Sequence, residues 1–305
     1  MRIGVDLGGT KIEAAVLADD GRIVLRQRVH TPQGNYDETI EALAKLVEAC
    51  EVAAGPHASV GIGIPGAISP ATGVVKNANS TWLIGRPLAE DLSRRLGRTV
   101  RLANDANCFA LSEAVDGAGA RAGTVFGVIL GTGVGGGIVI GGRVVAGANA
   151  VAGEWGHNPL PGMRGGSGGE VEWPGPSCYC GRNGCIETYL SAPGLARDFQ
   201  RHSGRQLSPG EVVESASRGD AQAEACLARY EDRLARSLAA VINLLDPDVI
   251  VLGGGLSNVS RLYANVPRLW SRYVFSDAVV TRLVPPVHGD SSGVRGAAWL
   301  WPASA

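Results

Sequence analysis

The sequence lacks several features that would assign it to a membrane or nucleic-acid-binding class. None of its apolar runs approaches the ~20 residues needed to cross a bilayer. Charge is balanced at a formal net value of −1, so no positive excess favours nucleic acid or an anionic membrane. The first residues, MRIGVDLGGT, have the pattern of a strand and a loop rather than of a cleavable signal. We therefore expect a cytoplasmic globular protein, long enough for two domains, with no nucleic acid or membrane as partner.

Cysteine is scarce and unevenly distributed. Three of the six cysteines lie in the stretch CYCGRNGCIET, at Cys178, Cys180 and Cys185. Thiols stay reduced in the cytoplasm, so a tight cluster favours a metal site over disulfides. Three thiolates need one further ligand for tetrahedral zinc, and unligated buried thiols or a redox role are the alternatives. The other three lie in helical patterns and are expected to be small buried side chains: Cys50, Cys108 and Cys226.

Hydrophobic periodicity predicts an α/β protein built from two similar halves. In the first half we expect strands at 2–8, 12–18, 22–30 and 59–65, a helix at 36–54, and a strand running into a helix over 100–115. In the second half we expect two strands and a third short one within 124–147, a strand from 248, helices at 220–245 and 261–270, and a C-terminal helix.

A strand, a glycine loop and a second strand occur twice, at 2–18 and at 125–140. This repeat predicts two α/β domains, 1–118 and 119–305, with a cleft between them and a hinge near DGAGARAG at 116–123. The C-terminal helix is expected to pack back on the first domain.

Glycine loops between paired strands are candidate phosphate sites. Their backbone N–H groups bind anions, and the missing Cβ lets a phosphate come close, although a plain hairpin turn is the alternative for each loop. Neither loop fits a dinucleotide fingerprint or a P-loop, because no helix of the required kind follows. A third glycine turn, LGGGLS, suits the adenosine end of a nucleotide, although a plain helix N-terminus would have the same pattern. The candidate nucleotide-binding residues are Gly8, Gly9, Thr10, Lys11, Gly131, Thr132, Gly133, Gly253, Gly254 and Gly255.

Six motifs in order, DLGGTK, NDAN, GTGVGGG, GEWGH, CYCGRNGCIE and LGGGLS, resemble the ROK family of sugar kinases and sugar-responsive repressors across essentially the whole chain. The stretches NANSTWL, GEWGHNPLP and HGDSSGVRGAAWLWP are most similar to bacterial fructokinase/mannokinase members, with N-acetylglucosamine kinases and glucokinases as close relatives. The resemblance implies the actin-like, ribonuclease-H-like ATPase fold, ATP and Mg²⁺ as cofactors, and a homodimer.

Phosphoryl transfer requires that the protein bind the phosphates and position the metal ion. It also requires that the attacking hydroxyl be aligned with the phosphorus and that a base accept its proton. Asp105 stands at the start of a helix, where a carboxylate stays ionised, and an N-cap role is the alternative. The resemblance makes Asp105 the general base. Asp6, which ends the first strand, would assist magnesium or cap the turn. The resemblance also implies the sugar ligands, which are Asn79, Asn104, Asp105, Glu154, His157 and Glu187.

His157 is, by the same resemblance, the fourth zinc ligand, so one ring nitrogen would bind structural zinc while the other binds the sugar. Residues 162–177 form a longer link than in many relatives and are expected to bulge out as a loop.

The predicted function is an ATP-dependent hexose kinase that phosphorylates the 6-hydroxyl of fructose or mannose. An N-acetylglucosamine kinase or a glucokinase of the same family is the alternative. A sugar-sensing regulator would belong to another class, and we do not expect it because the chain starts at the phosphate loop without a helix-turn-helix. A non-catalytic sugar-binding module is not expected while Asp105 and both loops are intact.

Overall fold

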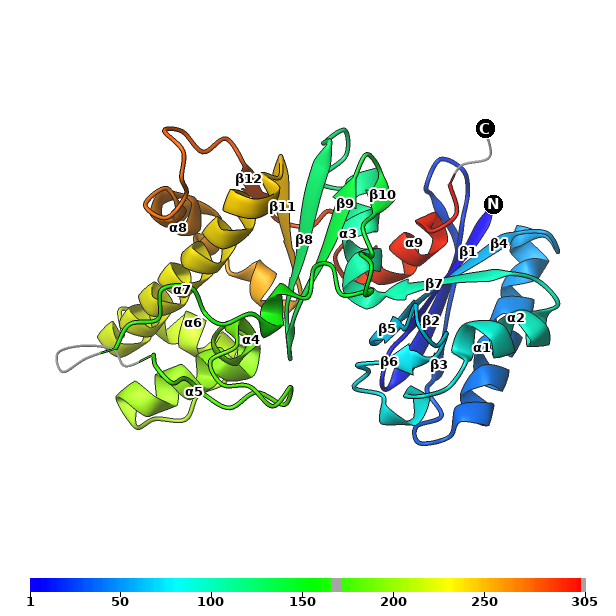
Figure 1. Ribbon diagram of the computed structural model, residues 1–305, viewed down its shortest axis with the longest axis horizontal. Helices are drawn as coiled ribbons and strands as arrows, with labels where there is room; N and C mark the ends of the chain where they lie inside the picture. Colours follow the sequence, from blue (N-terminus) through cyan, green and yellow to red (C-terminus); the bar gives the residue numbers. More distant parts are fainter. Residues whose placement is uncertain (166–171, 303–305) are drawn as a thin grey trace. The chain divides into compact units, whose positions relative to one another are not determined.

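The structure is a computed structural model that describes residues 1–165 and 172–302 (Figure 1). The chain folds into two compact units. The first contains Met1–Ala122, Gly137–Gly153 and Val287–Ala305, and the second contains Gly123–Gly136 and Glu154–Pro286. The units are therefore interleaved along the chain, whereas the repeat in the sequence suggested two continuous stretches.

The first unit contains a five-stranded sheet in the order β3-β2-β1-β4-β7. Its strands are β1 (Arg2–Leu7), β2 (Lys11–Leu17), β3 (Ile23–His30), β4 (Ser59–Ile64) and β7 (Val100–Asn104). The pairs β1–β2 and β2–β3 are antiparallel, and β1–β4 and β4–β7 are parallel. Two short strands, β5 (Ala67–Ile68) and β6 (Val75–Lys76), form a separate pair, followed by the 3-10 helix η1 (Thr81–Leu83).

Both faces of this sheet are covered, which explains why β2 is buried along nearly its whole length. Ala14 and Val16 join the core beneath α1 (Tyr36–Ala54), whereas Ala15 and Leu17 pack against Val294 of α9 (Ser292–Trp299). Successive strand residues point to opposite faces, so one apolar strand serves both layers. The unit also contains α2 (Leu88–Leu96) and α3 (Asp105–Val115).

The C-terminal helix α9 lies very close to the sheet and to α3 (Figure 1). A Cβ at Gly4 of β1 would overlap the carbonyl of Val294, and one at Gly61 of β4 would overlap the carbonyl of Ala297. On the other side of the helix, a Cβ at Gly296 would overlap the backbone of α3 at Cys108. Only glycine permits these backbone approaches.

The second sheet has the order β10-β9-β8-β11-β12. Its strands are β8 (Thr124–Leu130), β9 (Val134–Ile140), β10 (Arg143–Val144), β11 (Val249–Gly253) and β12 (Arg282–Val284). Numbered within each half, both sheets follow the same order, 3-2-1-4-5. This shared order confirms the predicted duplication and the actin-like α/β fold.

The helices of the second unit are α4 (Ile186–Leu190), α5 (Ala192–Ser203), α6 (Pro209–Ser217), α7 (Ala221–Leu245) and α8 (Arg261–Trp270), with the 3-10 helices η2 (Trp155–His157) and η3 (Gly255–Asn258). The 3-10 helix η4 (Gly289–Ser291) precedes α9 in the first unit. None of the helices within residues 1–165 and 172–302 has the length and apolar character of a membrane span.

The segment 162–177, expected to bulge outward, has a buried anchor. Residues 166–171 lie outside the described residues, but Glu172 is only 1% exposed. Its carboxylate accepts hydrogen bonds from Arg233 Nε (2.9 Å), Arg236 (2.7 Å) and the backbone N–H of Arg164 (3.0 Å). Burial alone would raise the pKa of Glu172, but the Arg236 and Arg233 guanidiniums and this N–H hold it below its ordinary value. The end of the segment is thus fixed to α7.

Candidate functional site

The predicted metal ligands converge within the second unit. His157 ends η2, Cys178 and Cys180 lie in the loop before α4, and Cys185 is the N-cap residue of α4. One ligand atom from each lies within 4.8 Å of the others. Cys178 Sγ is 3.6 Å from His157 Nδ1, and Cys180 Sγ is 3.6 Å from Cys185 Sγ. Zinc–sulfur bonds of about 2.3 Å in a tetrahedron place two sulfurs roughly 3.8 Å apart, so the donor set fits zinc.

The electrostatics of the thiols also suit a metal. Burial and the neighbouring thiols Cys180 and Cys178 raise the pKa of Cys185 to about 12. Burial opposes ionisation of Cys180 as well, but hydrogen bonds from Arg182 lower its pKa to about 6. A thiolate is therefore available at neutral pH to begin metal binding, and a bound cation would favour ionisation of the others.

His157 has a protein partner on each ring nitrogen. Nδ1 faces Cys178, and Nε2 lies 2.9 Å from the hydroxyl of Tyr179. The two rings also meet edge to face, with centroids 5.1 Å apart. Tyr179 is 82% exposed and is not among the site residues predicted from the sequence. Its position between two cysteines was the available signal, because an aromatic residue there must lie beside the metal ligands.

Glu187 is held against the second glycine loop. It lies on α4, and its Oε2 accepts a hydrogen bond of 2.9 Å from the backbone N–H of Val134. A Cβ at Gly133 would lie 2.6 Å from the same oxygen, so glycine is needed for this approach. Oε1 lies 4.0 Å from Cys178 Sγ. Glu187 thus connects the cysteine cluster to the loop that joins β8 and β9.

The turn containing Glu154 precedes His157 and is fixed by a tryptophan. Trp155 is buried, packs edge to face on Phe126 of β8, and donates a hydrogen bond of 3.0 Å to the carbonyl of Gly135. Glu154 is half-buried beside it. The structure therefore brings together three expected sugar ligands of the second unit, at the cysteine cluster and the β8–β9 loop: Glu154, His157 and Glu187.

The first glycine turn, between β1 and β2, is held by the residues that follow β3. The carbonyl of Gly8 accepts from the Thr31 hydroxyl (2.8 Å), that of Gly9 from Gln33 Nε2 (2.7 Å), and that of Thr10 from the Thr31 N–H (3.0 Å). In a trans peptide the N–H points opposite to the C=O. The N–H groups of Gly9, Thr10 and Lys11 are therefore directed away from residues 31–33, as an anion-binding turn requires.

Asp105 is an exposed carboxylate at the first residue of α3. Its Oδ1 accepts from the N–H of Ala106 (2.8 Å), and Asn104 Oδ1 caps the same N–H (2.9 Å). Asn104 Nδ2 also donates to the carbonyl of Gly66 (3.2 Å). The predicted sugar ligand Asn104 thus has a structural role, which is to hold the helix end that carries Asp105.

Asp6 belongs to the same unit and shares its electrostatics with Asp105. Burial and then the negative charge of Asp105 raise the pKa of Asp6 to about 7. A divalent cation would offset both effects, which suits the expected role in magnesium binding. Asn79 is exposed between β6 and η1, in the first unit like Asp105.

The glycine residues of the other two predicted nucleotide-binding turns have different structural roles. In the β8–β9 loop, which also contains Thr132, the N–H of Gly131 donates to the carbonyl of Gly133 (3.0 Å), and Gly131 accepts from Ala192 at the start of α5 (2.8 Å). After β11, which ends at Gly253, Gly254 has φ of +78° and approaches the backbone of Leu130, so it is required for the turn into Gly255 and η3.

Comparison with known proteins assigns the chain. A family model described as the ROK family matches residues 2–304. This chain belongs to the ROK family. The family predicted from the six motifs is therefore confirmed.

Among curated ROK relatives, N-acetyl-D-glucosamine kinase of Shigella boydii is 42% identical over 304 residues, covering 98% of this chain and 99% of the relative. Among solved structures, the ROK hexokinase of Thermus thermophilus is 32% identical with a TM-score of 0.85, covering 98% of this chain and 97% of that one. The ROK glucokinase of Streptomyces griseus, solved with glucose and AMPPNP, is 28% identical with a TM-score of 0.78 and covers 99% of each chain.

The chain is thus a ROK-family sugar kinase. The curated relatives favour the N-acetylglucosamine alternative over the fructose and mannose preference suggested by NANSTWL and the C-terminal motif.

Proposed function

We propose that this protein transfers the γ-phosphoryl group of ATP to the 6-hydroxyl of N-acetylglucosamine. The observation that carries this proposal is the 42% identity to N-acetyl-D-glucosamine kinase over nearly the full length of both chains. Glucose, fructose and mannose are then poorer substrates, because a site that reads an acetamido group leaves polar atoms unpaired when that group is missing.

Asp105 is the general base of the proposed reaction. Its carboxylate is exposed at a helix N-terminus, which favours the ionised form, and its Oδ1 is held by the N–H of Ala106. It accepts the proton of the 6-hydroxyl as that oxygen forms its bond to the γ-phosphorus and the bond to the β-phosphate bridging oxygen breaks. Asn104 fixes the helix end, so the carboxylate needs no reorganisation.

The phosphates are assigned to the glycine turns. Gly9, Thr10 and Lys11 direct their N–H groups away from residues 31–33, and the β8–β9 loop provides the second contact. Asp6 would assist Mg²⁺, which neutralises phosphate charge when bound.

The sugar is read from the cysteine cluster. The proposed zinc is structural: it would hold His157 Nδ1 and the loop before α4, and so place Glu187 and the other nitrogen of His157. Together with Glu154 and Asn79, these groups supply several acceptors and donors, as a polyol requires. A homodimer remains a prediction, checked by light scattering.

A coupled ADP-release assay tests the proposal. N-acetylglucosamine should give a kcat/KM at least tenfold above that of glucose, fructose and mannose. A higher value for any of these three would refute the substrate assignment, and no turnover on all four would refute the kinase.

The role of Asp105 is tested by the variant Asp105→Asn, which should keep sugar binding and lose most of kcat, by a factor of about 10²–10⁴. The matched control is Asp37→Asn, another exposed aspartate in the first turn of a helix. Near-normal kcat in Asp105→Asn would reject the base assignment.

A further inference from the structure

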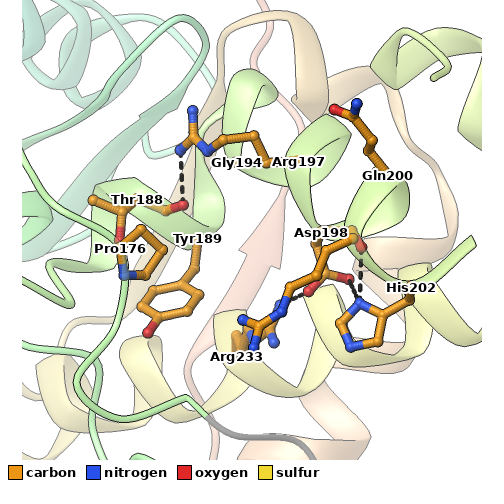
Figure 2. Close-up of a pocket in the computed structure, with 10 residues that line it drawn as sticks. Pro176, Thr188, Tyr189, Gly194, Arg197, Asp198, Gln200, His202 and Arg233 are labelled. Atoms are coloured by element: carbon orange, nitrogen blue, oxygen red, sulfur yellow. Dashed lines mark hydrogen bonds and ion pairs between the residues drawn. The ribbon is translucent and has the colours of Figure 1, made fainter. Parts of the chain in front are cut away.

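A cavity lies among the helices of the second unit. It has a volume of about 360 Å³, within the range of small-molecule sites. Figure 2 shows Pro176 and Tyr189 on one side of it and Asp198 and His202 on the other. Thr188, Arg197, Arg201 and Arg233 also line it. None of these residues has a role in the proposed reaction.

The described acidic groups near this cavity, Asp198 and Glu172, already form ion pairs with arginines. Asp198 Oδ1 pairs with Arg233 (2.8 Å), and its Oδ2 pairs with Arg229 (2.7 Å). Glu172 is bound by Arg233 and Arg236 of α7. Burial opposes ionisation of Asp198, but Arg233 and Arg229 keep its pKa below the ordinary value, so it stays ionised and neutralised. Asp198 and Glu172 therefore form their ion pairs with arginines of α7.

Two arginines of α5 have no carboxylate partner among the described residues. Arg197 donates to the carbonyl of Thr188 (3.1 Å), as Figure 2 shows, and within the described part of the chain neither Arg197 nor Arg201 forms an ion pair. They are four residues apart on one helix, so both lie on the same face about 6 Å apart along the axis. Their guanidiniums leave positive charge at the wall of the cavity.

The spacing of the two arginines and the rings that also line the cavity indicate the ligand. One guanidinium satisfies the two oxygens of a carboxylate, whereas a phosphate has three terminal oxygens and can accept from two arginines. The side-chain rings of Tyr189 and Pro176 can pack against a small ring-shaped ligand. We propose that this cavity binds the phosphate monoester of a sugar, with Arg197 and Arg201 on the phosphate and Tyr189 and Pro176 against the sugar ring.

The cavity shares a helix with the candidate sugar site. Thr188 and Tyr189 of α4 line it, while the preceding residue, Glu187, reaches Val134. A ligand in the cavity therefore contacts the five-residue helix that positions Glu187 and would change the KM for the sugar. This consequence rests on the proposed function, whereas binding itself does not.

Calorimetric titration with glucose 6-phosphate tests the site. Saturating N-acetylglucosamine and AMPPNP are added to fill the catalytic site, and no turnover is required. We expect the Kd to rise at least about tenfold in Arg197→Gln/Arg201→Gln. It should stay unchanged in the control Arg94→Gln/Arg218→Gln, which removes two exposed arginines elsewhere. No binding to the wild type, or equal Kd values in all three proteins, would overturn the proposal, and so would an equal loss in the control.

Inorganic phosphate is the second probe and should bind more weakly, because it lacks a ring to contact Tyr189. Binding as tight as that of glucose 6-phosphate would refute recognition of the sugar. Both arginines are exposed, so we expect the double variant to fold. If its thermal unfolding differs from that of the wild type, the single variant Arg201→Glu replaces it in the same comparison of Kd values. An unchanged sugar KM with the cavity filled would reject the link through α4.

Discussion

Substituting Gly133 by alanine should damage sugar use without damaging the fold. The new Cβ would lie 2.6 Å from Glu187 Oε2, and ordinary contact begins at 3.4 Å, so the carboxylate must move by about 0.8 Å. This shift weakens or breaks the 2.9 Å hydrogen bond from Val134. A hydrogen bond to a charged group contributes about 1.5–3 kcal/mol, which corresponds to a loss of roughly 10- to 100-fold in kcat/KM for the sugar.

The matched control is Gly131→Ala in the same loop. No heavy atom lies within 4 Å of a Cβ at Gly131, so Glu187 keeps its place. This variant should leave the KM for the sugar unchanged and raise the KM for ATP, since the loop is assigned to the phosphates. Steady-state kinetics with each substrate varied, and thermal melts of both variants, provide the measurements. A wild-type sugar KM in Gly133→Ala, or the same increase in Gly131→Ala, would refute the reasoning.

Three further changes test other parts of the structure. Cys185→Ser should reduce the zinc content, measured by elemental analysis, from about one per chain to well below that value. It should also lower the melting temperature measured by calorimetry, and full zinc content would contradict the ligand set. Tyr179→Phe should lower the sugar KM about two- to tenfold, because the tyrosine hydroxyl no longer competes for His157 Nε2, and a raised KM would show that Tyr179 instead orients the ring. Glu172→Gln should lower the free energy of unfolding by about 1.5–3 kcal/mol at pH 7. That difference should shrink as pH falls below 4.5, because a carboxyl group with a depressed pKa stabilises the fold above its unfolded pKa and loses this effect when protonated; a constant difference down to pH 3 argues against it.

The long, periodic elements were predictable from the sequence. The helix at 36–54 has the predicted bounds, and α7 begins one residue later than expected, because their apolar side chains recur at helical spacing. The strand–glycine–strand repeat predicted that the two halves of the chain would contain similar sheets. The helices α2, α4, α5 and α6 were not predicted. The helix α4 has only five residues, too few for a clear periodicity, whereas α6 carried a local signal that was overlooked, the capping box of Ser208 and Glu211.

Within the candidate site, the cysteine cluster was predictable because Cys178, Cys180 and Cys185 are close in sequence, whereas His157 was added from the family resemblance. The Tyr179–His157 contact and the burial of Glu172 were not. Glu172 lies in a glycine-rich segment, and its arginine partners follow 61 and 64 residues later on α7. Nothing local marks a carboxylate as buried when its partners are so distant. The same holds for Arg197 and Arg201, which pair with no carboxylate in the part of the chain that the structure describes, a fact that emerges only when the neighbouring ion pairs are known.

The close seating of α9 has a consequence for biosynthesis. The first strand is covered by a helix made from residues 292–299, whose close approach Gly4, Gly61 and Gly296 permit. Chains grow from the N-terminus, so a ribosome must synthesise residues 292–299 before the sheet of the first unit can close its second face. The second unit, whose last residue is Pro286, is complete earlier. The unit that starts the chain is therefore expected to be the last to finish folding, and a nascent chain that stops before α9 would expose Ala15 and Leu17 to chaperones.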